Sequence, residues 1–183
     1  ALHAHGARVA ARAAKNAGAV QFIQMSAIGA DENSASEYAR TKAVGEAAAR
    51  EEFPGATIIR PSIVFGPEDN FFNQFAAIAR ISPIMPLFGG GETKFEPIFV
   101  GDVAEAVARA VDGRVDGPRI YELGGPEIMS LRDVFEFVAR ITGRKRVMVP
   151  VPTMAAMFKA AFLQLLPKPL LTIDQVRLLA VDS

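Results

Sequence analysis

Residues 20–66 constrain the fold of this chain more than any other stretch, because they hold two apolar runs with a helical pattern between them. The first run, VQFIQM over Val20–Met25, predicts a short buried strand that ends at Ser26, and a glycine-containing turn follows. The second run, over Ala56–Arg60, is rich in β-branched residues and is typical of a buried strand in a parallel sheet. This order of strand, helix and strand predicts an α/β fold.

A helix is expected between these two strands. Ser34 and Glu37 stand in capping-box spacing, which predicts that the helix begins near Ser34, and its pattern extends to about Glu52. Tyr38 and Lys42 are four residues apart, so both side chains lie on one face of this helix.

Tyr38, Lys42 and Ser26 form a constellation suited to proton transfer: a phenol, an ammonium one turn later, and a hydroxyl at the carboxyl end of a strand. The lysine would favour the phenolate and lower the pKa of Tyr38 towards neutral pH. A Tyr-x-x-x-Lys spacing also arises by chance, so the alternative interpretation is an exposed amphipathic helix with a solvated lysine.

The features around this helix favour the first interpretation. A strand ending in Ser26 precedes the helix, and Arg60-Pro61-Ser62 and then FGP follow it, an order that resembles the extended or atypical branch of the short-chain dehydrogenase/reductase superfamily. Longer runs, including FGPEDNFFNQF, FEPIFVGDVAEAV, YELGGPE and PLLTIDQVRLL, resemble one family: the nucleotide-binding accessory subunit of respiratory complex I (NADH:ubiquinone oxidoreductase) and its bacterial relatives. The resemblance covers nearly the whole chain.

The resemblance implies the C-terminal part of a Rossmann-like doubly wound parallel sheet, with a smaller substrate-like lobe. We expect residues 1–118 to form the Rossmann-like part, with inserted lobe segments, and residues 119–183 to form the smaller lobe. No G-x-G-x-x-G turn occurs in the sequence, and Gly89–Gly91 is no substitute because a strand pattern follows it. The half that carries the glycine turn is therefore expected to be absent from these residues.

The resemblance also implies a dinucleotide site for NADP(H) or NAD(H). Tyr38 and Lys42 would hold the cofactor, together with Pro61, Ser62 and Ile63, which follow the second strand where the superfamily contacts the nicotinamide amide. The alternative for these three residues is a rigid exit from strand to loop. As an accessory-type subunit the protein would keep its cofactor for structural reasons.

The alternative function is an active NAD(P)-dependent oxidoreductase or epimerase/dehydratase that acts on a small polar or nucleotide-sugar substrate. In it Tyr38 would be the acid/base, Lys42 would tune the pKa of Tyr38 and clamp the ribose, and Ser26 would polarise the carbonyl. Ser26 precedes Tyr38 by 12 residues. That spacing is similar to classical members, whereas extended members usually place the two residues further apart.

Composition limits the partners. The formal net charge is zero with both signs dispersed, which gives no indication of a nucleic-acid partner. There is no cysteine, and the two histidines, His3 and His5, do not share a helix face, so no metal site is expected. No membrane-spanning run opens the sequence. We expect a reducing, cytoplasm-like compartment, and contact with complex I subunits would add peripheral association with the inner membrane.

The remaining pattern predicts further elements. Thr153–Leu166 is expected to be a core or domain-packing helix, with an interfacial helix as the alternative. The other expected elements are a helix over Ala1–Ala17, a helix over Phe71–Arg80, a lid-like loop over Ser82–Gly91, a strand over Lys94–Val100, a helix capped by Asp102 and ending at Gly113, a strand over Arg119–Leu123, a helix capped by Ser130 and ending at Gly143, a strand over Val147–Val149 and a last helix capped by Thr172.

Overall fold

The computed structural model describes residues 2–115 and 119–152 and forms two compact units. Unit 1 consists of Ala1–Val64 and Ile98–Gly125, and unit 2 consists of Phe65–Pro97 and Pro126–Ser183. Each unit is therefore built from two separate stretches of sequence. The expected boundary between residues 118 and 119 falls instead after Gly125, because the strand near residue 120 belongs to the sheet of unit 1.

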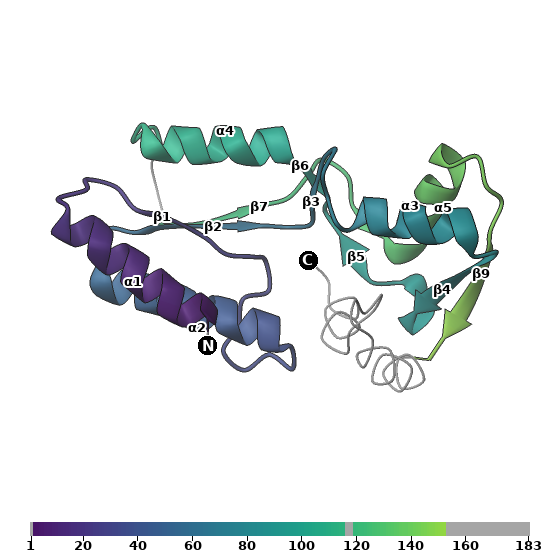
Figure 1. Ribbon diagram of the computed structural model, residues 1–183, viewed down its shortest axis with the longest axis horizontal. Helices are drawn as coiled ribbons and strands as arrows, with labels where there is room; N and C mark the ends of the chain where they lie inside the picture. Colours follow the sequence, from purple (N-terminus) through teal and green to yellow (C-terminus); the bar gives the residue numbers. More distant parts are fainter. Residues whose placement is uncertain (1, 116–118, 153–183) are drawn as a thin grey trace. The chain divides into compact units, whose positions relative to one another are not determined.

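Unit 1 is a parallel sheet with helices on both faces. Its elements are α1 (Leu2–Asn16), β1 (Ile23–Met25), α2 (Glu37–Glu52), β2 (Thr57–Pro61), β3 (Val64–Phe65, whose second residue opens unit 2), β6 (Ile98–Phe99), α4 (Val100–Val111) and β7 (Ile120–Leu123). The sheet has the order β1-β2-β7 with both pairings parallel, and the short strands β3 and β6 pair separately. Helices α1 and α2 cover one face of the three-stranded sheet and α4 covers the other (Figure 1). The predicted α/β fold with a doubly wound parallel sheet is confirmed.

Burial explains this layering. Strand β2 is the central strand, and Ile58 and Ile59 are almost completely buried, as a strand covered on both faces requires. Helices α1 and α2 meet through small side chains, Ala7, Ala11 and Ala49, which allow the two backbones to approach closely.

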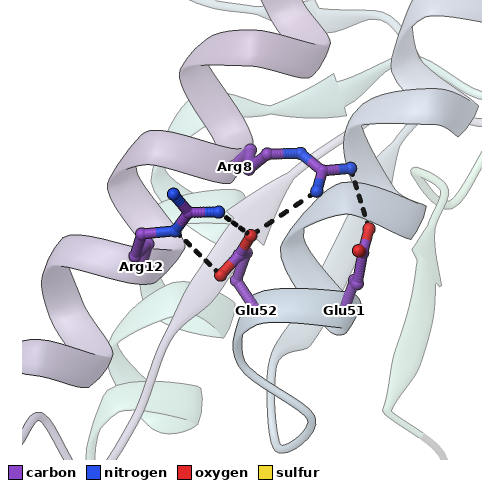
Figure 2. A network of polar contacts seen from close by, with 4 residues as sticks. All are labelled: Arg8, Arg12, Glu51 and Glu52. Atoms are coloured by element: carbon purple, nitrogen blue, oxygen red, sulfur yellow. Dashed lines mark hydrogen bonds and ion pairs between the residues drawn. The ribbon is translucent and has the colours of Figure 1, made fainter.

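Ion pairs border this helix contact on the outside. Arg8 donates to Glu51 at 2.8 Å, and Arg12 donates to both carboxylate oxygens of Glu52 at 2.6 and 3.0 Å (Figure 2). The side chains of Arg12 and Glu51 are 59% and 63% exposed, whereas that of Glu52 is only 15% exposed. Because water screens the exposed partner of each pair, the pairs contribute modestly to stability. The network therefore lies beside the alanine contact between α1 and α2 and is not part of that core.

Unit 2 has a core of aromatic and aliphatic side chains between two helices and short strands. Its elements are α3 (Phe72–Ile81), β4 (Ile84–Phe88), the 3₁₀ turn η1 (Gly89–Gly91), β5 (Lys94–Phe95), β8 (Met129–Ser130), α5 (Leu131–Ile141) and β9 (Val147–Val151). Strands β4 and β9 pair in parallel, and β5 and β8 pair antiparallel. Phe75 packs edge-on against Phe71 and Phe135, with ring centroids 5.0 and 4.7 Å apart.

Two predicted helix starts are wrong. Helix α2 begins at Glu37, because Ser36 rather than Ser34 is the N-cap and its Oγ accepts the N–H of Ala39. Helix α4 begins at Val100 without a side-chain cap, and Asp102 lies inside its first turn. The predicted cap of α5 is confirmed, since Ser130 and Asp133 bond reciprocally in a capping box.

The predictions of a lid-like loop and of one long strand are also wrong. Half of the expected loop over Ser82–Gly91 is strand β4, which gains its partner from β9 more than fifty residues later. The expected strand over Lys94–Val100 is broken into β5 and β6, which pair with different strands. Both errors arise because strand pairing is decided by distant partners that local composition does not show.

Within residues 2–115 and 119–152, none of the helices has the length and apolar character needed to cross a membrane. The predicted helices over Thr153–Leu166 and after Thr172 lie outside the described residues.

Candidate functional site

Tyr38 and Lys42 lie together on α2, as their spacing predicted. The neighbouring Ala39 and Ala43 are buried, so the two longer side chains stand at the edge of the buried face. Tyr38 keeps 36% of its surface exposed, and the Nζ of Lys42 lies over its ring, 5.4 Å from the ring centroid. The ammonium therefore interacts with the face of the phenol ring.

The pKa of Tyr38 departs from the expectation. Partial burial raises the pKa of Tyr38, whereas the sequence led us to expect Lys42 to lower it. That expectation is wrong because removal of the phenolate from water dominates over any attraction to the ammonium. Burial also lowers the pKa of Lys42, and the charge of Glu46 opposes this change. Tyr38 is consequently a protonated hydrogen-bond donor at neutral pH.

Ser26 lies at the carboxyl end of β1 and is almost fully buried. Its Oγ donates to Oε1 of Glu46 at 2.5 Å, and its N–H donates to the carbonyl of Ile59 at 2.7 Å. The hydroxyl proton is thus directed at a carboxylate of α2.

Glu46 is the centre of a buried polar cluster that the sequence pattern did not predict. It is 1% exposed, and Arg60 donates to its carboxylate through Nε and Nη2, both at 2.8 Å. Arg60 also donates through Nη1 to Glu122 on β7 at 3.1 Å. Two sequence signals could have identified this cluster: Glu46 is one turn beyond Lys42, and Arg60 is a charged residue in an otherwise buried strand.

The loop after β2, taken here as Pro61–Ile63 and beginning at the last residue of the strand, is held at both sides by backbone bonds. The carbonyl of Pro61 accepts the N–H of Ile28 at 3.1 Å, and the N–H of Ser62 donates to the carbonyl of Leu123 at 2.9 Å. The carbonyl of Ile63 accepts the N–H of Ile98 at 2.9 Å. The loop therefore lies at the carboxyl ends of three parallel strands, where open α/β sheets bind ligands.

The structure brings the predicted site residues together in two groups. Ser26 joins α2 through Glu46, and on that helix Lys42 lies one turn before Glu46 and pairs with Tyr38 two turns before it. Pro61, Ser62 and Ile63 are connected to the Ser26 turn through backbone bonds rather than through their side chains. In the part of the chain that the structure describes, no three His, Cys, Asp or Glu side chains are grouped to hold a metal ion.

Comparison with known proteins gives a family match over most of unit 1. The model of the NAD dependent epimerase/dehydratase family matches residues 2–124. This range includes all the candidate site residues.

One curated relative matches over nearly the whole chain, and another matches over less than half of it. The mitochondrial NADH dehydrogenase (ubiquinone) 1 alpha subcomplex subunit 9 of Arabidopsis thaliana is 33% identical over 187 residues, which cover 96% of this chain and 46% of that protein. The ceramide reductase of Caulobacter vibrioides is 44% identical over 82 residues, which cover 45% of this chain and 26% of the reductase. The chain thus spans less than half the length of these relatives.

Solved structures show the same fold. A dTDP-glucose 4,6-dehydratase from Streptomyces venezuelae, solved with NAD and TYD bound, aligns with a TM-score of 0.66 over 80% of this chain and 52% of its own. Its sequence identity of 21% supports a shared fold and no more.

Proposed function

The chain belongs to the NAD dependent epimerase/dehydratase family, and we propose that it holds NADP(H) or NAD(H) as an accessory-type subunit of respiratory complex I. The cofactor would be retained for structural reasons rather than turned over. The Tyr38–Lys42 pair carries this proposal, because it presents two hydrogen-bond donors side by side at the edge of α2.

The donor chemistry of this pair fits a ribose. A protonated phenol and an ammonium both donate hydrogen bonds, and the hydroxyl oxygens of a ribose accept them. The raised pKa of Tyr38 keeps its proton in place over the neutral range. When bound, the nicotinamide ring supplies a hydride donor or acceptor; Tyr38 and Lys42 would bind and orient the sugar next to it.

The loop after β2 offers the cofactor fewer backbone N–H donors than its three residues, Pro61, Ser62 and Ile63, suggest. Pro61 has no N–H, and the N–H of Ser62 already donates to Leu123. We therefore assign the carboxamide contact to the N–H of Ile63, and Pro61 and Ser62 hold the loop in place.

Two observations support retention of the cofactor over turnover. The hydroxyl of Ser26 donates to Glu46, so it would have to leave a buried carboxylate before it could polarise a substrate carbonyl. Tyr38 has a raised pKa, which disfavours the phenolate needed for a general base. The relatives that are named as subunits of NADH dehydrogenase agree with this assignment.

The second candidate function is an active oxidoreductase or epimerase/dehydratase on a small polar or nucleotide-sugar substrate. The 44% identical stretch shared with a ceramide reductase supports it, and a protonated Tyr38 could still act as a general acid. In that case Lys42 would clamp the ribose as before.

The partners and location follow from the first function. Assembly with complex I subunits would place the protein peripherally at the inner membrane, and an enzyme of the second kind would act in the cytoplasm. Copurification of the native protein with membrane subunits of complex I supports the accessory function. Purification apart from the complex I subunits, together with turnover of the cofactor, supports the enzyme function.

Calorimetric titration of the protein at its native full length with NADPH and NADH tests cofactor binding. Lys42→Ala should weaken binding roughly 10–100-fold, because a charge-assisted hydrogen bond to the ribose is lost. Tyr38→Phe should change binding much less, and Lys15→Ala, an exposed lysine on α1, should leave it unchanged. Wild-type affinity in Lys42→Ala would show that the pair does not hold the cofactor.

Turnover is measured on the same proteins with a panel of carbonyl and nucleotide-sugar substrates. The accessory function predicts no cofactor-dependent turnover above background. Turnover that Tyr38→Phe abolishes would establish the enzyme instead.

A further inference from the structure

Glu46 joins three elements that carry or adjoin the residues proposed to bind the cofactor, Tyr38, Lys42 and Ile63. These residues are called the cofactor face. Its carboxylate accepts hydrogen bonds from Ser26 after β1 and from Arg60 near the end of β2, and it is carried by α2. The backbone contacts between Ser26 and Ile59 and between Ile28 and Pro61 connect the same two strand ends. One buried carboxylate therefore fixes the helix against both loops.

The location of Glu46 on α2 also connects it to Lys42. The two residues are four apart, so they share a helix face, and Tyr38 lies one further turn towards the helix N-terminus. Any displacement of α2 relative to the Ser26 turn would consequently move Tyr38 and Lys42 relative to the Ile63 amide.

Stability alone does not account for this cluster. A buried ion pair can often be replaced by apolar side chains of similar volume without loss of stability, because the desolvation penalty offsets the attraction. Hydrogen bonds with fixed directions do what apolar packing does not: they set the orientation of each partner.

We propose that Glu46 is a positioning residue, whose bonds to Ser26 and Arg60 hold the Ser26 turn and the Pro61–Ile63 loop in register with Tyr38 and Lys42. This inference rests on the proposed function, since the face so arranged is the one assigned to the cofactor. It assigns Ser26 a supporting role through Glu46.

The test uses a paired apolar replacement, Glu46→Leu with Arg60→Met, in the native full-length protein. The pair removes the bonds without leaving one charge buried alone, but the buried hydroxyl of Ser26 loses its acceptor. The thermal midpoint should therefore fall by only a few degrees, the cost of one unpaired hydroxyl. NADPH affinity should nevertheless fall roughly tenfold. The isosteric single variant Glu46→Gln is the second test, for use if the paired variant fails to fold, and it should also weaken binding.

Glu52→Gln is the matched control. Glu52 is on the same helix and is also paired with arginine, but it faces α1 rather than the cofactor side (Figure 2). Its affinity for NADPH should equal that of the wild type. An equal loss of affinity in Glu52→Gln would overturn the inference, because the effect would then follow from a general disturbance of α2.

Amide hydrogen exchange of the cofactor-free protein separates the two proposals. In the paired variant the amides of Ser26 and Ile28 should exchange roughly tenfold faster, while those of Thr57 and Ile58 at the other end of β2 stay protected. If the wild type binds no dinucleotide, the proposed function fails. The positioning role of Glu46 is then judged by exchange alone: faster exchange in the paired variant supports that role, and unchanged exchange overturns it. Wild-type affinity in the paired variant overturns the inference whatever the exchange rates.

Discussion

Thr57 carries a buried hydroxyl that has no hydrogen-bond partner within the described residues. It is the first residue of β2 and is 1% exposed. A buried hydroxyl without a partner keeps its desolvation cost and gains nothing in return. Thr57→Val should therefore raise the free energy of unfolding by about 1 kcal/mol, measured by denaturant titration.

Thr142→Val is the matched control for this change. The hydroxyl of Thr142 donates to the carbonyl of Val138 at 2.8 Å, so its loss should not stabilise the protein. A Thr57→Val variant less stable than the wild type would mean that the hydroxyl has a partner in solution.

The raised pKa of Tyr38 predicts how the stability of the protein depends on pH. Its pKa in the folded protein is raised by burial above the value of about 10 expected for the unfolded chain. The folded state thus favours the neutral phenol, so this contribution to stability is fully present below about pH 10 and is lost as the pH rises through the folded pKa. Tyr38→Phe should flatten the fall of the unfolding free energy above about pH 10. Ultraviolet titration of the phenolate, compared with the Tyr38→Phe variant, measures the pKa directly.

The sequence was sufficient to predict that Tyr38 and Lys42 share one face of α2, but not their electrostatics. Helix spacing placed Tyr38 beside Lys42, because one turn of helix is a local geometric rule. The direction of the Tyr38 pKa depends on burial by the surrounding chain, which spacing does not contain. The bonds of Glu46 to Ser26 and Arg60 join residues 20 and 14 positions away, and only the assembled sheet brings them together.

At the scale of single elements, the start of α5 has a complete capping box. The Oγ of Ser130 accepts the N–H of Asp133, and Asp133 in turn accepts from the backbone and hydroxyl of Ser130. Ser130→Ala should lower the free energy of unfolding by about 1 kcal/mol, as removal of an N-cap usually does. Thermal or denaturant unfolding measures the loss, and no loss would mean that the cap is replaced by water.

The same cap gives a pH dependence of known sign. The hydrogen bonds from the hydroxyl and backbone N–H of Ser130 lower the pKa of Asp133 in the folded state. Its contribution to stability is therefore present above the unfolded value of about 3.9 and is lost as the pH falls through the lower folded pKa. Asp133→Asn should remove this part of the acid sensitivity, and an unchanged acid profile in that variant would contradict the assignment.

Local signals predicted helices better than they predicted strands. The α5 cap was readable because Ser130 and Asp133 bond to each other, whereas Ser34 and Ser36 compete for the start of α2 and only Ser36 takes the N-cap position. The composition around β4 predicts a loop because Pro83 precedes the strand, Pro86 lies within it and three glycines follow it. Its strand character comes from pairing with β9 and from burial of Met85 and Leu87.

At the scale of the whole chain, cofactor binding should need more than the residues described above. The 183 residues contain no glycine turn of the dinucleotide type, and pyrophosphate recognition in this fold requires that turn at a helix N-terminus. Calorimetric titration of the 183-residue chain alone with NADPH should give a Kd above about 1 mM. Micromolar binding there would mean that the cofactor site lies elsewhere than proposed.

The interleaving of the two units has a consequence for the order of events during protein synthesis. Strand β2 ends at Pro61, yet its partner β7 begins at Ile120, so one edge of β2 stays unpaired while the intervening residues leave the ribosome. At typical elongation rates this interval lasts about 3–12 s. The first stretch of unit 2 emerges within the same interval and waits in turn for residues after Pro126. Unit 1 is thus completed first, and a nascent chain stalled before Ile120 would present an open strand edge to chaperones.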